Sequence, residues 1–320
     1  IILLLIILQF IDDRKVAFLA ILPFVFFPSA MTWYTQIHKD GYFILGNLLF
    51  LYGWLLLIEI IRENGKWQEI FIRVLLIELG TFFIWLVRPY GVQIIQGLTF
   101  IINVVISILL VCLFLKKRIP LKKMLITILL CWMVLVMITP FTKGGIDTGE
   151  PIVQVYWVNS RWIPDFIESK FYHLSKVREG YSDKYQEAGS NIDINIHFHS
   201  MNDVFGFIPR AMEIILFAPF PNDWLGEGTT DWNTIMRRIS GFEMIIVYIS
   251  LFSLIFFMIN NWRNVKFWLL LYFCMGMMLI YGLTIPNIGS LYRVRYGFLL
   301  TVVAFGWVEL TFFFRKKSLL

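Results

Sequence analysis

Nine apolar segments follow one another along the chain, separated by short polar stretches except for the long segment 141–239. They cover about residues 1–10, 16–35, 41–61, 70–88, 93–115, 124–140, 240–260, 267–285 and 297–314. A helix of about 20 apolar residues crosses the hydrocarbon core of a membrane, so most of these segments are long enough to span it. We expect the segment 16–35 to be kinked or partly re-entrant, because it contains Pro23 and Pro28. The pattern predicts an all-α polytopic membrane protein with about eight or nine transmembrane helices.

The composition agrees with a chain embedded in lipid. Hydrophobic residues make up 58% of the 320 residues, charged residues only 16%, and the mean hydropathy is +0.73. A soluble domain is about 45–50% apolar and about 25% charged, so the composition excludes a soluble globular enzyme and a disordered chain. Cys112, Cys131 and Cys274 lie inside apolar runs and indicate neither a disulfide framework nor a zinc site.

The first apolar run is only about ten residues long and begins without a methionine. No basic stretch precedes it and no small-residue cleavage site follows it, so a signal peptide is disfavoured. We expect the chain to begin inside a transmembrane helix and to be incomplete at its N-terminus.

The distribution of Lys and Arg predicts the orientation of the chain. One alternating set of short connections holds fourteen basic residues and the opposite set holds four. Because basic connections stay in the cytoplasm, the segment 141–239 is predicted to lie outside. We therefore expect three parts in a bacterial cytoplasmic membrane: N-terminal helices over 1–140, an extracytoplasmic segment over 141–239, and C-terminal helices over 240–320. The net charge of +6 reflects this topology, and no nucleic-acid partner is predicted.

The outside segment carries patterns of its own. Apolar residues recur at helical spacing over 160–179, and isoleucines alternate with polar residues from Ile192 to His199. Residues 205–220 read as a short helix at the membrane interface. These patterns predict a mixed α/β cap on the outer leaflet.

Four basic residues break the topology rule: Lys39, Arg88, Arg293 and Arg295 lie at the predicted outer boundary. Ionisable groups at this depth face a bundle interior or a cavity and are functional candidates, although long basic side chains also reach the headgroups by snorkelling. Arg293 and Arg295 follow Pro286, Asn287 and Gly289, in a turn that can direct both guanidinium groups inward. Paired guanidinium groups match phosphate oxygens, so a lipid-linked phosphate is the predicted ligand of these cations.

Asp40 lies beside Lys39 at the predicted outer start of the next helix. An acidic residue there stabilises the helix as a cap, and it is also a candidate for a catalytic or metal-binding role. Glycosyl transfer needs both kinds of residue, since a carboxylate deprotonates the acceptor hydroxyl and cations stabilise the departing phosphate.

Several short motifs carry a family resemblance. They are Pro28-Ser29-x-x-x-Trp33-x-x-x-x-x-Lys39-Asp40, Leu86-Val87-Arg88-Pro89-Tyr90, Pro209-Arg210, Phe217-Ala218-Pro219-Phe220-Pro221, and Pro286-Asn287-Ile288-Gly289 leading into Arg293 and Arg295. With these motifs the chain resembles, from about residue 20 to 300, the multi-spanning GT-C-type glycosyltransferases of bacterial envelopes.

The resemblance implies an enzyme that transfers a sugar from a polyprenyl-phosphate carrier, at the outer face, to a glycan, lipid or protein acceptor. The family places one acidic residue in the first outer loop and another at the start of a later helix. Asp40 fits the second position, and the first would lie upstream of Ile1, so this chain alone is expected to lack the main catalytic carboxylate. A polymerase or ligase of lipid-linked oligosaccharides, and a non-enzymatic transporter of a lipid-linked glycan, are the alternatives. No nucleotide-binding motif is present, and no cofactor is indicated beyond a divalent cation, which stays open.

Two further groups of polar residues each allow two interpretations. His197 and His199 share one face of the predicted strand, which fits either a pair of metal ligands or a solvated face. Glu78, Glu243 and Glu309 lie within predicted spans, where a carboxylate serves either a proton relay or helix packing. We favour the solvated face and helix packing.

Overall fold

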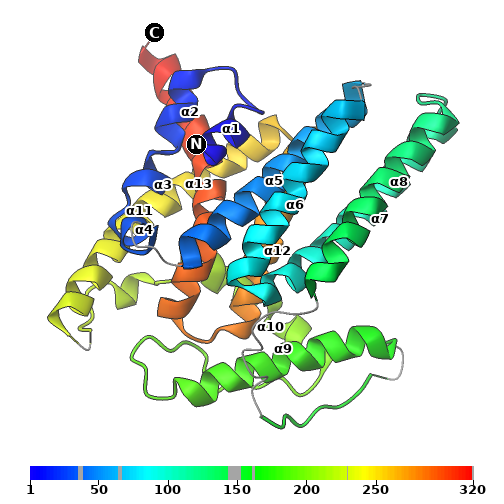
Figure 1. Ribbon diagram of the computed structural model, residues 1–320. Coiled ribbons are helices and arrows are strands. Elements are labelled where there is room, and N and C mark those ends of the chain that lie inside the picture. Colours follow the sequence, from blue (N-terminus) through cyan, green and yellow to red (C-terminus); the bar gives the residue numbers. More distant parts are fainter. Residues whose placement is uncertain (35–38, 64–66, 143–152, 161–162, 229, 319–320) are drawn as a thin grey trace. The chain divides into compact units, whose positions relative to one another are not determined.

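The computed structural model describes all residues except 35–38, 64–66, 143–152, 161–162, 229 and 319–320. Helices dominate the described residues, which contain no β-strand (Figure 1). In the described part of the chain, seven helices are long and apolar enough to cross a membrane: Lys39–Glu59, Glu69–Val87, Pro89–Leu115, Leu121–Ile138, Asp231–Asn260, Val265–Thr284 and Ile288–Arg315. The chain is a multi-pass helical membrane protein, as predicted, with seven such helices among its described residues in place of eight or nine.

The elements follow the predicted segments closely. They are α1 (Ile2–Ile7), α2 (Arg14–Ala20), α3 (Leu22–Phe26), α4 (Pro28–Tyr34), α5 (Lys39–Glu63), α6 (Trp67–Val87), α7 (Pro89–Leu115), α8 (Leu121–Ile138), η1 (Thr139–Thr142), α9 (Asp165–Lys184), α10 (Met201–Phe217), η2 (Pro221–Asp223), α11 (Asp231–Asn260), α12 (Val265–Thr284) and α13 (Ile288–Ser318). The predicted span 16–35 is divided among α2, α3 and α4. Pro23 and Pro28 lack the amide hydrogen that a continuous helix needs, which explains why this segment is broken.

The chain forms two compact units that interleave along the sequence. The first contains Ile1–Ile21, Tyr34–Ile146 and Met258–Phe273, and the second contains Leu22–Trp33, Asp147–Phe257 and Cys274–Leu320.

In the first unit, α5 and α6 lie side by side and α7 and α8 form a hairpin (Figure 1). Glycines let the backbones of α5 and α6 approach closely, since a methyl group on Gly80 would lie 2.6 Å from the carbonyl oxygen of Gly46. Lys266 on α12 adds polar contacts to this unit, at 3.3 Å from a carboxylate oxygen of Glu59 and 3.4 Å from the side-chain oxygen of Gln9.

In the second unit, α13 is largely buried and packs against α11. A methyl group on Gly306 of α13 would lie 1.9 Å from the carbonyl oxygen of Ser250 on α11, so only glycine fits there. Gly282 of α12 similarly packs on α10, where a methyl group would lie 2.5 Å from the side chain of Ile215. Small residues at crossings of this kind are typical of membrane helix packing.

The predicted helices of the segment 141–239 are present as α9 and α10, and residues 143–152 and 161–162 lie outside the described part. Ser200 caps α10 by accepting a hydrogen bond from the amide of Asp203, and Pro209 lies inside the helix.

The predicted strand from Ile192 to His199 is wrong, and with it the mixed α/β character of the cap. Among the described residues this segment contains no strand, and the nearest β-pairing is an isolated bridge between Asn191, just before it, and Asn287. The side chain of Arg178 donates instead to the carbonyl oxygens of Ile196, Asp193 and Leu283, at 2.9, 2.7 and 3.1 Å. Alternation predicts a strand only where a neighbouring strand is available, and here a buried arginine takes that place.

Candidate functional site

Asp40 and Arg88 form a buried ion pair in the first unit. Asp40 lies in the first turn of α5 and is 1% exposed, and Arg88 lies just before α7 and is 7% exposed. Arg88 also donates to the hydroxyl of Tyr90 at 2.7 Å, and its guanidinium carbon lies 5.1 Å from the ring centroid of Phe43. The structure therefore brings together two of the predicted site residues that are 48 positions apart in the sequence.

The Arg88–Pro89 sequence explains why the arginine lies at this point. A residue before proline avoids the helical region of backbone space, and Arg88 adopts φ −148° and ψ 77° between α6 and α7. Pro89 then begins α7 at the first helical position, where its missing amide hydrogen has no cost. The chain turns at Arg88, and the side chain meets the start of α5.

Lys39 is the first residue of α5 and is exposed next to the Asp40–Arg88 pair along the chain. Three of the five predicted site residues therefore belong to the first unit, at the start of α5 and of α7. A carboxylate, a guanidinium group and an ammonium group at helix ends offer one proton acceptor and two cations for an anion.

Arg293 and Arg295 belong to the second unit, and their predicted turn is not present. Both lie within α13, which begins at Ile288, so their side chains leave the helix about 200° apart. Arg293 is half-buried and Arg295 is fully buried.

The guanidinium group of Arg295 closes the C-terminal end of α10. It donates to the carbonyl oxygen of Ile214 at 2.5 Å and to that of Ala218, and it lies 5.2 Å from the ring centroid of Tyr292. A cation there is favoured because the last carbonyl groups of a helix carry partial negative charge. These contacts assign Arg295 a structural role that the sequence pattern did not predict.

Glu243 is the centre of a buried polar cluster, also in the second unit. It lies in α11 and accepts hydrogen bonds from the amide of Ser29 at 2.9 Å, from the hydroxyl of Ser29, and from the hydroxyl of Tyr292 at 3.1 Å. The hydroxyl of Ser29 lies 2.9 Å from that of Tyr296. Glu243 was predicted as a packing or relay residue, but its partners were not, since Ser29 is 214 positions away.

Two arginines of the segment 141–239, Arg178 in α9 and Arg210 in α10, also bind polar groups within the protein. Burial lowers the pKa of Arg178 to about 10, which leaves it charged at neutral pH. Arg210 donates to carboxylate oxygens of Asp193 and Glu213, both at 2.8 Å, and these hydrogen bonds raise the pKa of Arg210.

His197 and His199 take separate partners. The Nδ1 atom of His197 lies 2.7 Å from a carboxylate oxygen of Glu179, and that of His199 lies 3.2 Å from the carbonyl oxygen of Tyr156. Among the described residues, no group of three or more His, Cys, Asp or Glu side chains is placed to hold a metal ion.

Comparison with known proteins identifies no related protein. No protein-family model, curated protein or solved structure matches this chain. The apolar helices define the class as a multi-pass helical membrane protein, and any more specific function rests on the site residues themselves.

Proposed function

We propose that this protein is a membrane glycosyltransferase that takes a sugar from a polyprenyl-phosphate carrier at the outer face of the bacterial cytoplasmic membrane. The buried Asp40–Arg88 pair, with Lys39 next to it in sequence, is the observation that supports the proposal. Buried charges are costly in a membrane protein and are mostly retained at functional positions. The transfer needs this combination, a proton acceptor beside cations that can hold a phosphate.

The proposed reaction gives each residue one role. Asp40 accepts the proton of the acceptor hydroxyl as its oxygen forms a bond to the anomeric carbon of the sugar. The bond between that carbon and the phosphate oxygen breaks, and the electron pair leaves with the polyprenyl phosphate. Arg88 orients Asp40 and, together with Lys39, stabilises the negative charge that develops on the leaving phosphate.

The test is an assay of full-length protein in membranes with labelled polyprenyl-phosphate sugars. We expect Asp40→Asn to lower transfer by a factor of about 10²–10⁴, the usual contribution of a general base. Glu69→Gln is the matched control, because Glu69 occupies the first turn of α6 as Asp40 does that of α5. The variant Asp40→Asn/Arg88→Gln removes both buried charges and separates loss of folding from loss of chemistry.

The outcomes are distinct. The proposal requires the double variant to remain folded and inactive while Glu69→Gln keeps full activity. Wild-type transfer by folded Asp40→Asn protein would reject Asp40 as the base. The product of the same assay distinguishes the alternatives, since a transferase adds one sugar, a polymerase adds repeated units, and a ligase transfers a whole oligosaccharide.

A second candidate, transport of a lipid-linked glycan, is favoured by the Glu243 cluster. The carboxylate is 3% exposed within a spanning helix and is bound by the amide of Ser29, which follows the break between α3 and α4. Transporters combine such carboxylates with discontinuous helices. If the protein is a transporter, Glu243→Gln abolishes proton-driven translocation in vesicles; if it is a transferase, folded Glu243→Gln protein keeps its transfer activity.

A further inference from the structure

The turn between α7 and α8 concentrates positive charge in a stretch of sequence without acidic residues. Lys116, Lys117, Arg118, Lys122 and Lys123 lie within eight positions, and the sequence from 79 to 146 contains no Asp or Glu. All but the half-buried Lys123 are exposed. None of the five forms an ion pair with a carboxylate in the part of the chain that the structure describes.

A hydrogen-bonded backbone turn connects α7 to α8. The amide of Arg118 donates to the carbonyl oxygen of Leu113 at 3.0 Å, and the amide of Lys117 donates to the carbonyl oxygen of Phe114 at 2.8 Å. These two hydrogen bonds form a Schellman motif. Lys117 occupies the left-handed position of this motif, with φ 54°. Glycine is usual there, since any other residue costs about 1 kcal/mol or more. A lysine is present at a position where the turn itself favours glycine.

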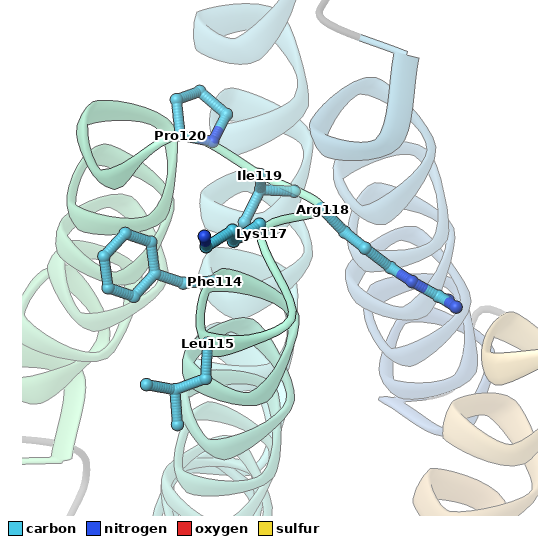
Figure 2. Close-up of a pocket in the computed structure, with 6 residues that line it drawn as sticks. All are labelled: Phe114, Leu115, Lys117, Arg118, Ile119 and Pro120. Atoms are coloured by element: carbon cyan, nitrogen blue, oxygen red, sulfur yellow. The ribbon is translucent and has the colours of Figure 1, made fainter.

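An open surface pocket of about 580 Å³ lies at the same turn, lined by four apolar residues together with Lys117 and Arg118 (Figure 2). In the close-up, Phe114 and Leu115 extend from the end of α7, and Pro120 lies across the turn at the start of α8. Leu115 is 71% exposed, and Leu121 on the other side of the turn is 49% exposed. Cations therefore lie directly beside apolar side chains that are open to the surroundings.

The ends of the spanning helices place the turn near the bilayer surface. It joins the ends of two helices that are able to span a membrane. It also lies at the far end of α7 from Arg88, because the 27 residues of that helix extend about 40 Å. Clusters of four to eight basic residues next to a spanning helix are typical of sites that bind anionic lipids.

We propose that the α7–α8 turn binds the phosphate headgroup of an anionic membrane phospholipid. Lys117, which lies on the same side of the turn as Phe114, binds the phosphate, and Arg118, whose guanidinium group extends to the other side of the turn (Figure 2), adds positive charge that attracts the anionic headgroup. Phe114, Leu115 and Leu121 contact the upper part of the acyl chains. The inference is independent of the proposed transferase activity, because it uses neither Asp40 nor Arg88.

The test is a titration of the purified full chain in neutral detergent with phosphatidylglycerol or phosphatidylcholine, with bound lipid counted by native mass spectrometry. The informative variant is Lys117→Gly/Arg118→Gln, in which glycine suits the left-handed position and preserves the turn. A basic residue at an anionic headgroup contributes about fivefold in affinity, so we expect a loss of about fivefold to thirtyfold for phosphatidylglycerol and none for phosphatidylcholine.

Two controls distinguish binding at a specific site from a general effect of net charge. Arg14→Gln/Lys15→Gln removes the same charge at the start of α2, directly after Asp12 and Asp13, and should leave phosphatidylglycerol binding unchanged. Glycerol phosphate, which lacks acyl chains, should not displace the lipid at equal concentration. Unchanged binding by Lys117→Gly/Arg118→Gln, an equal loss in the control variant, or displacement by glycerol phosphate would each overturn the proposal.

Discussion

The buried pair of Asp40 and Arg88 yields the sharpest stability prediction. Removing one partner of a buried ion pair costs about 3–5 kcal/mol, because the other charge remains in a medium of low polarity. Arg88 also contacts Tyr90 and Phe43, and neither contact involves Asp40. We therefore expect Asp40→Asn to lower the free energy of unfolding by about 3 kcal/mol, near the lower end of this range.

The double-mutant cycle with Arg88→Gln measures the coupling between the two side chains. Each single variant leaves one charge buried, whereas the double variant leaves none, so its loss should be smaller than the sum of the two single losses by about 2 kcal/mol or more. Reversible unfolding of the purified protein in mixed micelles, followed by circular dichroism, provides the free energies. Additive losses would refute a direct ion pair and, with it, the placement of Arg88 as the residue that orients Asp40.

Other substitutions test the packing and the cap on α10. Gly80→Val should destabilise the protein by about 1–3 kcal/mol, because the valine side chain would overlap the backbone of Gly46. Gly97→Val is the control: a side chain there meets nothing within 4 Å, so it should have little effect in the same unfolding assay. Arg295→Met should cost about 3 kcal/mol, since two carbonyl groups lose a charged donor. A loss under about 1 kcal/mol in the same assay would contradict the assigned role of Arg295.

The spanning helices could be predicted because lipid forces the backbone to satisfy its own hydrogen bonds. Length and hydropathy alone are then sufficient for most segments, and the proline positions predicted the break within 16–35. The strand at Ile192–His199 could not be judged in this way. The conformation of this segment depends on Arg178, which donates hydrogen bonds to three backbone carbonyl oxygens. Nothing in the sequence indicates that this polar residue is buried.

The candidate site was predictable in part for a similar reason. Asp40 and Arg88 were each identified by charge at a predicted membrane boundary, and the structure pairs them. The turn assigned to Arg293 and Arg295 was wrong because α13 already begins at Ile288. The hydroxyl partners of Glu243 were not identified, since Ser29, Tyr292 and Tyr296 carry no signal that relates them to a carboxylate in another helix.

The most direct test of the central claim is the orientation of the chain in the membrane. In a Cys112→Ser background, a single cysteine is introduced at exposed Asp183 in α9 or at exposed Arg118 in the α7–α8 turn. Intact spheroplasts are then treated with a membrane-impermeant maleimide. We expect labelling of Asp183→Cys in intact spheroplasts and of Arg118→Cys only after lysis. Labelling of Arg118→Cys in intact spheroplasts, with Asp183→Cys protected, would place Asp40 and Arg88 at the cytoplasmic face and contradict the proposed function.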